Sequence, residues 1–152
     1  MNWIISKTRK MNYHTNLRAL MLPVWEDIKN YQWVVSDLEY MSSDPVPINY
    51  EQDYFILSPE EFSILANADL QIIWGVICGI PADEEIEIDE DRLPYVEGND
   101  LIWENGNIQL EQAVIEIVCF DSSYTILKFK NVGLSEKFKS IFEEAIELEK
   151  FK

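Results

Sequence analysis

The clearest hydrophobic pattern lies between residues 113 and 131, AVIEIVCFDSSYTILKFKN. Residues 114–120 and 124–129 are dominated by β-branched and aromatic side chains, which are enriched in strands. The residues between them, 121–123, are Asp-Ser-Ser, whose short polar side chains bond to nearby backbone in turns. The pattern predicts a β-hairpin. The first arm has Glu116 as its only charge, which is typical of a strand with both faces largely covered.

Three further stretches have the composition of strands, namely residues 31–40 (YQWVVSDLEY), 54–57 (YFIL) and 70–80 (LQIIWGVICGI). The last of these is the most continuously apolar run in the chain, which predicts a central strand. Further on, Ile86 and Ile88 alternate with acidic residues. Part of that acidic run can therefore pair as an edge strand with its charges outward, a device that limits aggregation.

Two helices are predicted in the first half of the chain. Apolar residues recur at helical spacing over residues 15–28, but Pro23 should kink this helix or split it in two. Residues 59–66 begin with proline and two glutamates after Ser58, and this is the composition of a capped helix start.

A third amphipathic helix is predicted for residues 136–150, with Ser135 as its N-cap. The length of 152 residues and the 47% hydrophobic content favour a single domain over residues 1–152. Together the elements predict an α+β fold, in which a single mixed, mainly antiparallel sheet has a C-terminal hairpin and helices packed on one face.

The net charge of −16 is concentrated in the middle of the chain. Residues 37–120 contain twenty acids and one base, whereas residues 1–36 carry +3 and residues 121–152 are neutral. Such a field repels nucleic-acid phosphates and anionic membranes and attracts basic proteins. We therefore expect a basic protein partner, with no binding to nucleic acid or membrane. The alternative is that the charge serves solubility alone.

Residues typical of catalytic or metal sites are few. His14 is the single histidine, and Cys78 and Cys119 lie in apolar runs where a thiol behaves as a small hydrophobic group. One histidine and two distant cysteines do not make a zinc site, and no glycine-rich phosphate loop is present. We expect no catalytic residue, metal or cofactor, so an enzyme is the minority interpretation. Reduced cysteines and the lack of a signal-peptide pattern predict a cytoplasmic protein.

The predicted binding surface is the segment from Asp83 to Glu104. Acids crowd its first part, and apolar and aromatic residues are interleaved further on. Charge next to aromatic anchors allows an acidic protein to capture a basic partner quickly and tightly. The predicted binding residues are Asp83, Glu84, Glu85, Glu87, Asp89, Glu90, Asp91, Tyr95 and Trp103.

Three other interpretations stay open. The acids can be a solvated edge whose apolar neighbours pack into the core. The chain can be a structural homodimer, rather than a monomer, formed through an exposed sheet edge. It can also be a small ligand-binding or hydrolase-like domain that uses carboxylates in a cleft. The expected lining of that cleft is drawn from Glu39, Asp53, Asp100, Tyr95 and Trp103.

Two segments carry a resemblance to known families, VWEDIKNYQWVVSDLEY around Trp33 and EQAVIEIVCFDSSYTILKFKN with its acid-Ser-Ser-Tyr turn. With the final amphipathic helix, they resemble a small bacterial family of unknown function that has a tryptophan strand near its start and such a hairpin before its last helix. In size, charge and lack of catalytic residues, the chain is similar to the acidic immunity proteins of bacterial toxin systems. That similarity implies an α+β inhibitor that occupies the active face of a toxin.

Overall fold

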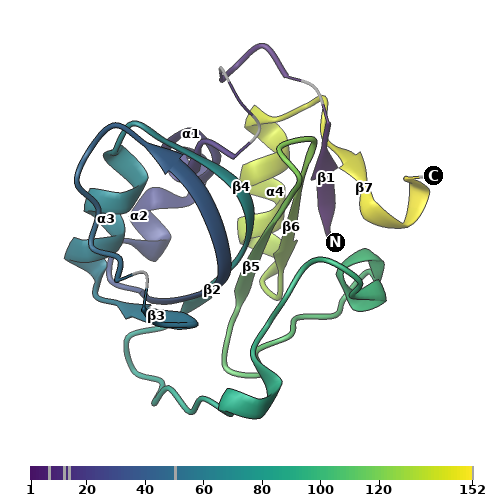
Figure 1. Ribbon diagram of the computed structural model, residues 1–152. Coiled ribbons are helices and arrows are strands. Elements are labelled where there is room, and N and C mark those ends of the chain that lie inside the picture. Colours follow the sequence, from purple (N-terminus) through teal and green to yellow (C-terminus); the bar gives the residue numbers. More distant parts are fainter. Residues whose placement is uncertain (7, 12, 14, 50, 152) are drawn as a thin grey trace.

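The structure, a computed structural model, describes residues 1–6, 8–11, 13, 15–49 and 51–151. Its strands form one seven-stranded sheet in the order β3-β2-β4-β5-β6-β1-β7 (Figure 1). Every pairing between described strands is antiparallel, and the predicted α+β class is confirmed. The strands are β1 (Trp3–Ile5), β2 (Gln32–Ser42), β3 (Tyr54–Leu57), β4 (Leu70–Ile80), β5 (Ile115–Phe120), β6 (Tyr124–Phe129) and β7 (Ile146–Glu147).

The predicted hairpin is confirmed as β5 and β6. Its turn has positive φ angles at Asp121 (47°) and Ser122 (55°), and the Ser123 N–H donates to the Phe120 carbonyl at 2.9 Å. Two left-handed residues in a row match the twist of a hairpin, and short polar side chains tolerate that conformation. The hairpin lies in the middle of the sheet, with β4 beside β5 and β1 beside β6.

Strand β2 bends sharply along its length (Figure 1). Its pairing with β4 shifts register between Ser36 and Glu39 and again between Glu39 and Tyr40. Asp37, inside this bulge, has a φ of 53°, which is uncommon for a residue other than glycine. A bulge adds residues to one strand and strengthens its twist, so the acidic side chains of this stretch are redirected out of the regular ladder.

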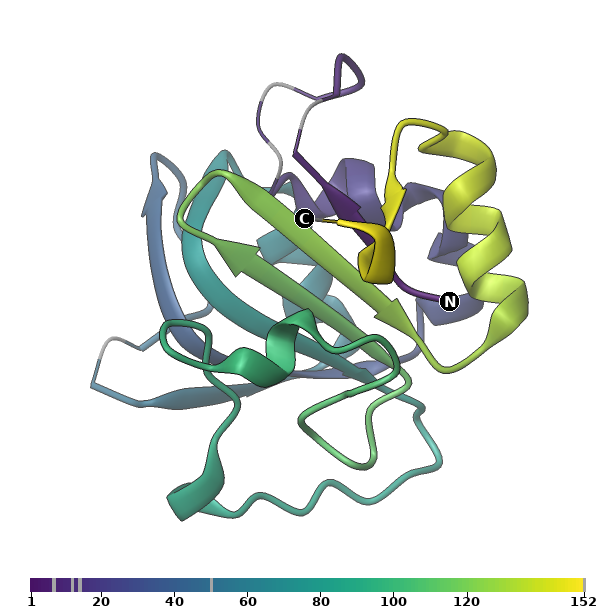
Figure 2. The same ribbon diagram turned by 90° about the vertical axis from the view of Figure 1, so that its right-hand side faces the viewer.

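Among the described residues, four α-helical segments lie against one face of the sheet, α1 (Leu17–Met21), α2 (Trp25–Ile28), α3 (Pro59–Asn67) and α4 (Val132–Ile141) (Figure 2). The break predicted at Pro23 is confirmed, because a 3₁₀ turn, η1 (Leu22–Val24), separates α1 from α2. The start of α3 is also confirmed. Ser58 accepts a hydrogen bond from the Glu61 N–H at 3.1 Å, and the Glu61 carboxylate accepts one from the Ser58 N–H, also at 3.1 Å.

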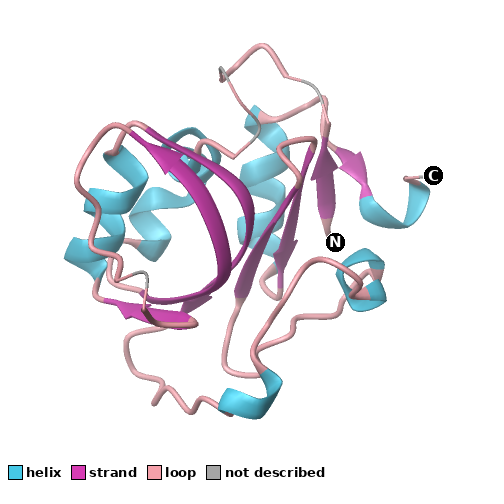
Figure 3. Cartoon of the chain, in the orientation of Figure 1, coloured by secondary structure: helices cyan, strands magenta, loops and turns pink. Residues whose placement is uncertain are grey.

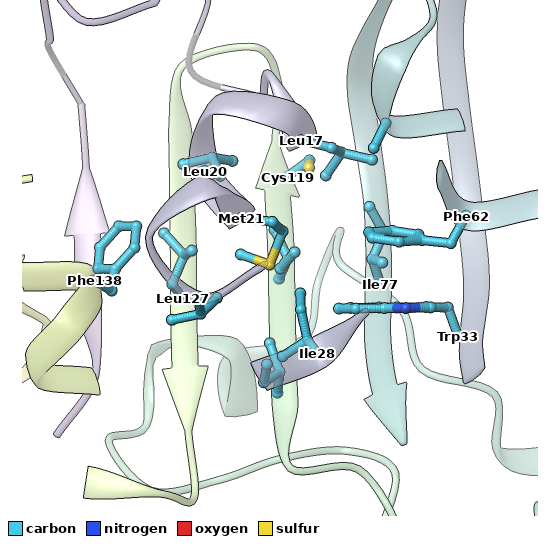
Figure 4. Close-up of a cluster of buried hydrophobic side chains, with 14 of the residues drawn as sticks. Leu17, Leu20, Met21, Ile28, Trp33, Phe62, Ile77, Cys119, Leu127 and Phe138 are labelled. Carbon is cyan, nitrogen blue, oxygen red and sulfur yellow. The ribbon is translucent and has the colours of Figure 1, made fainter. Parts of the chain in front are cut away.

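The core under the helices is centred on Trp33 of β2. Its ring stacks on Phe62 of α3 with the ring centroids 3.9 Å apart (Figure 4). On β4, Gly79 gives this ring room, because a Cβ atom there would lie 2.9 Å from it. Helix α1 adds Leu20 and Met21 to this core, and both are fully buried (Figure 4). Close packing of this kind makes the helix-covered face sensitive to any change in volume.

The helix predicted for residues 136–150 with a Ser135 cap is wrong in its bounds. Helix α4 begins at Val132, because Asn131 accepts a hydrogen bond from the Leu134 N–H at 3.1 Å and so caps it. Ser135 is instead buried inside the helix, and its Oγ accepts a hydrogen bond from Trp3 Nε1 at 2.9 Å. The helix ends at Ile141 because the chain beyond it joins the sheet as β7, in which Ile146 pairs with Ile4 of β1. Sheet pairing overrides the helical pattern here.

The opposite face of the sheet is covered by residues 81–114, which we call the covering loop (Figure 2). Within the described residues it contains two 3₁₀ turns, η2 (Glu90–Arg92) and η3 (Asp100–Trp103), and no strand (Figure 3). The edge strand considered for Ile86 and Ile88 is therefore not formed. Both side chains are instead half-buried against the core of this face.

The two cysteines are buried and free, as predicted. Cys78 of β4 faces the covering loop, whereas Cys119 of β5 faces the helices, so the sheet separates them. Burial raises the pKa of both thiols, which keeps them protonated and unreactive. Among the described helices, none is long and apolar enough to cross a membrane.

Candidate functional site

A buried ion pair holds the covering loop on the sheet. Glu116 of β5 and Lys128 of β6 are cross-strand partners, with Lys128 Nζ 3.6 Å from Glu116 Oε1, and both side chains are fully buried. Lys128 Nζ donates to the Leu101 carbonyl at 3.0 Å, and the Gln109 N–H donates to Glu116 Oε2 at 2.7 Å. Burial raises the pKa of Glu116 and lowers that of Lys128. Each charge thus depends on the other and on loop backbone to stay ionised.

Strand β2 provides a second anchor for the loop. Ser36 Oγ donates to the Pro94 carbonyl at 2.8 Å, and Asp37 Oδ2 accepts from the Val96 N–H at 2.9 Å. The bulge in β2 makes these contacts possible because it turns Asp37 toward the loop. Together the two anchors hold the loop on the sheet from Pro94 to Gln109, a stretch that includes Glu97.

The predicted acids of residues 83–91 are all exposed along this loop. Asp89 caps η2 by accepting a hydrogen bond from the Asp91 N–H at 3.0 Å. Glu90 Oε1 accepts from the Tyr54 hydroxyl at 3.1 Å, which places the end of the acidic run beside β3. The acids therefore form an extended strip rather than a compact cluster, and the strip leads to the outer strand of the sheet.

A cleft of about 480 Å³ opens beside the bulge of β2. It lies between β2, the connection that leads into β3, Trp74 of β4 and Glu97 of the covering loop. Among the described residues, four carboxylates and three aromatic rings line it, and no basic side chain does. The lining residues are Asp37, Leu38, Glu39, Tyr40, Ile48, Gln52, Asp53, Phe55, Trp74 and Glu97.

A second hollow of about 430 Å³ continues from the cleft along β3. Gln52 and Asp53 line both spaces. The second hollow also contains Tyr54, Ile56, Glu90 and Leu93. The acidic strip and the acidic cleft therefore meet at β3, because Glu90 of the strip and Asp53 of the cleft both line the second hollow.

The chemistry of these carboxylates fits an organic cation better than a metal ion. Across the residues that the structure describes, no group of three or more His, Cys, Asp and Glu side chains is arranged to hold a metal. A guanidinium or ammonium group is recognised by carboxylates and by aromatic faces, and the lining of the cleft supplies both. An anionic ligand such as a phosphate would meet repulsion there.

Tyr95 and Trp103 lie apart from the cleft. Tyr95 is 49% exposed, and its carbonyl accepts a hydrogen bond from Asn99 Nδ2 at 3.0 Å. Trp103 is 36% exposed and stacks on Phe151 with centroids 6.2 Å apart, within an aromatic cluster over β5 and β6. Neither residue lines the cleft or the second hollow, so their part in binding stays a prediction.

Glu39 and Asp53, which the sequence suggested for a ligand cleft, do line one, whereas Asp100, Tyr95 and Trp103 do not. Sequence reasoning missed Asp37, Tyr40, Trp74 and Glu97. The available signal was the pair of acids in WVVSDLEY, since Asp37 and Glu39 place two charges on one face of a strand whose earlier residues are apolar. His14, which sequence reasoning had set aside, lies outside the described residues.

No family model, curated protein or solved structure matches this chain. The two resemblances therefore stay predictions, and the function rests on the site itself.

Proposed function

We propose that this protein binds a basic partner protein through an acidic face, and that it acts as an inhibitor of that partner in the manner of an immunity protein. The acidic face consists of the seven acids of residues 83–91 and the four carboxylates of the cleft. The observation that supports this proposal most is the lining of the cleft, whose described residues include four acids, three aromatic rings and no base. Such a lining accepts an arginine or lysine side chain of a partner.

The charge distribution supports the same conclusion. Residues 37–120 contain all eleven of these acids among twenty, with Arg92 as the single base. A concentrated field of one sign raises the association rate of a partner of opposite sign. The acids of the covering loop would guide the approach, and the cleft would then hold one basic anchor between carboxylates and rings.

The anchoring of the loop also favours recognition. Hydrogen bonds from β2 and from the buried ion pair fix its backbone between Pro94 and Gln109, the part that carries Glu97 of the cleft. A surface that is already ordered loses less conformational entropy on binding. The acidic face is therefore suited to tight binding as well as fast association.

A labelled hexa-arginine peptide tests the cleft directly by fluorescence anisotropy. The cleft variant carries Glu39→Gln, Asp53→Asn and Glu97→Gln, which remove three carboxylates and leave Asp37 to hold the loop. We expect its affinity for the peptide to fall by about tenfold or more, because it loses the charges nearest the bound guanidinium group.

The matched control carries Glu136→Gln, Glu143→Gln and Glu149→Gln, three exposed acids of the C-terminal part. Both variants lose the same charge, so a long-range field alone would weaken binding equally in the two. We expect less than about a twofold change in the control at 150 mM salt, where distant surface charges are screened. Equal losses in the two variants would show that the cleft is not a binding site.

A second candidate function is the binding of a small organic cation, and the volume of the cleft favours it. About 480 Å³ is within the range of small-molecule sites. Such sites are lined mostly by hydrophobic side chains, however, and this one is rich in carboxylates. If 1,6-diaminohexane bound as tightly as hexa-arginine and lost affinity in the same variant, the small-molecule function would be preferred.

A further inference from the structure

Strand β3 is the outer strand of the sheet on the side of the acidic face. It pairs along its whole length with β2, from Tyr54 opposite Ser36 to Leu57 opposite Trp33. Over the part of the chain that the structure describes, no backbone hydrogen bond reaches the other edge of β3. An edge of this kind is a template on which another extended chain can add a strand.

Two hollows of different character lie along β3. Side chains alternate across a strand, so Tyr54 and Ile56 face one side while Phe55 and Leu57 face the helices. On the first side is the hollow of about 430 Å³ that contains Asp53 and Glu90.

On the helix side is a third hollow, of about 400 Å³. Six of its nine described lining residues are apolar, and they come from the connection before β3 and from β3; α3 contributes Glu61. The lining residues are Val46, Pro47, Ile48, Asn49, Gln52, Phe55, Ile56, Leu57 and Glu61.

We propose that the basic partner presents an extended segment that pairs with β3, with basic side chains alternating with apolar ones. This inference rests on the proposed function and specifies its ligand. Because side chains alternate along an extended segment, every second one would enter the acidic hollow and the others the apolar hollow. The added strand would also lie beside the cleft, since Gln52 and Asp53 line both the cleft and the acidic hollow.

Charge argues against a second copy of this chain as the occupant. Two β3 edges paired with each other would bring the carboxylates of Asp53 and Glu90 near their own copies, in proteins that each carry −16. Like charges across a strand pair are destabilising. A basic segment gains from the same carboxylates, so the edge selects a partner of opposite charge.

The probe for this inference is an eight-residue peptide of alternating lysine and valine, acetylated and amidated at its ends. Two controls keep its composition or its charge. One control has four lysines followed by four valines. The other is a pair of alternating peptides in which every second amide is N-methylated, so that each peptide of the pair has one of its two edges blocked. We expect the block peptide, and the peptide methylated on the pairing edge, to bind about tenfold or more weakly, because each loses the alternation or the backbone hydrogen bonds.

Hydrogen exchange by NMR locates the pairing. Saturating alternating peptide should slow exchange of the outward amides of β3 by about tenfold or more, because they gain acceptors. The amides of α4 on the far part of the helix face should not change. If the peptide slowed hydrogen exchange in other segments but not in β3, the proposal would be overturned.

A substitution at Ile56 provides an independent test. Its side chain is 48% exposed and lines both the acidic and the apolar hollow, so a change there leaves the core intact. Ile56→Lys puts a cation where the basic side chains of the peptide should lie, and we expect about tenfold weaker binding. Ile56→Gln, the uncharged control, should lose about threefold or less. Equal effects of the two would contradict the predicted position of the lysines.

The outcomes separate this inference from the proposed function. If the methylated peptides bind as well as the parent but the cleft variant still loses affinity, strand pairing is wrong and the acidic binding face stands. If neither hexa-arginine nor the alternating peptide binds, the proposed function is wrong, and the inference about β3 is overturned with it.

Discussion

The two faces of the sheet are covered in different ways. On one face, helices pack on a core of aromatic and aliphatic side chains in which Trp33 and Phe62 stack. On the other, the irregular covering loop is fixed by the buried charges of Glu116 and Lys128 and by side-chain hydrogen bonds from β2. A helix satisfies its own backbone, whereas an irregular segment needs partners for its buried N–H and carbonyl groups.

This difference explains where the acidic face lies. The covering loop needs few apolar anchors, and its buried ones include Val96 and Ile102. Most of its remaining positions are free to carry charge, and the acids of residues 83–91 occupy them. Helices that cover a core must instead devote a regular stripe to apolar residues. The loop-covered face therefore combines a backbone fixed between Pro94 and Gln109 with an acidic surface.

The largest effect should come from the helix-covered face. We expect Trp33→Ala to lower the free energy of unfolding by about 4 kcal/mol, because it removes the ring that fills the space between Phe62 and Gly79. Urea denaturation measures this change. Trp103→Ala on the other face is the control, and we expect a loss of only about 1 kcal/mol because that indole is half-exposed. Similar losses would mean that the two faces do not differ in packing.

The next effect concerns the buried charges under the loop. Lys128→Met leaves Glu116 buried without its cation, and we expect a loss of about 3 kcal/mol near neutral pH. Burial already raises the pKa of Glu116 above its unfolded value, and removing the lysine raises it further. Folded Glu116 then binds a proton more tightly than unfolded Glu116 does. The loss should therefore shrink as the pH falls through the raised pKa toward about pH 4.5.

Urea denaturation of wild type and variant between pH 4.5 and 8 measures this dependence. The double variant Glu116→Leu with Lys128→Met is its control. It leaves neither charge buried, so its loss should be smaller than that of Lys128→Met and should not vary with pH in this way. A loss for Lys128→Met that stays constant with pH would show that Glu116 remains ionised without its partner.

The smallest effects compare one anchor from each face. Ser58→Ala removes the cap of α3, and Ser36→Ala removes the hydrogen bond to the Pro94 carbonyl. We expect each to lower the free energy of unfolding by about 1 kcal/mol. Their local effects should differ. Hydrogen exchange should quicken at the start of α3 in the first variant, and near Val96 of the covering loop in the second. If both variants showed the same pattern of hydrogen exchange, the two faces would not be anchored separately.

Much of the regular structure was predictable. The strands β3 and β4, the hairpin of β5 and β6, and the capped start of α3 follow the predicted residues. These elements depend on side-chain alternation, turn residues and caps, which act over a few neighbouring positions. The predicted bounds of the C-terminal helix were wrong because Ile146 pairs with Ile4, a residue far away in the sequence.

The candidate site was predictable only in part. The acidic run of residues 83–91 and its exposure follow from composition, and Glu39 and Asp53 were suggested as lining of a cleft. That these two meet Asp37 and Glu97 depends on the bulge in β2 and on the hydrogen bond from the Val96 N–H to Asp37. No local pattern specifies a contact between residues so far apart in the chain.

By itself, the sequence determined an acidic α+β protein with an apolar central sheet, because alternation and charge density are properties of short segments. Tertiary structure decided which acids share a space. It did so through the register of β2 on β4 and through the loop that lies across the sheet, held by the pair of Glu116 and Lys128. The register and the position of the loop depend on contacts between residues that are distant in sequence. Such contacts stabilise the protein only when the whole sheet has formed.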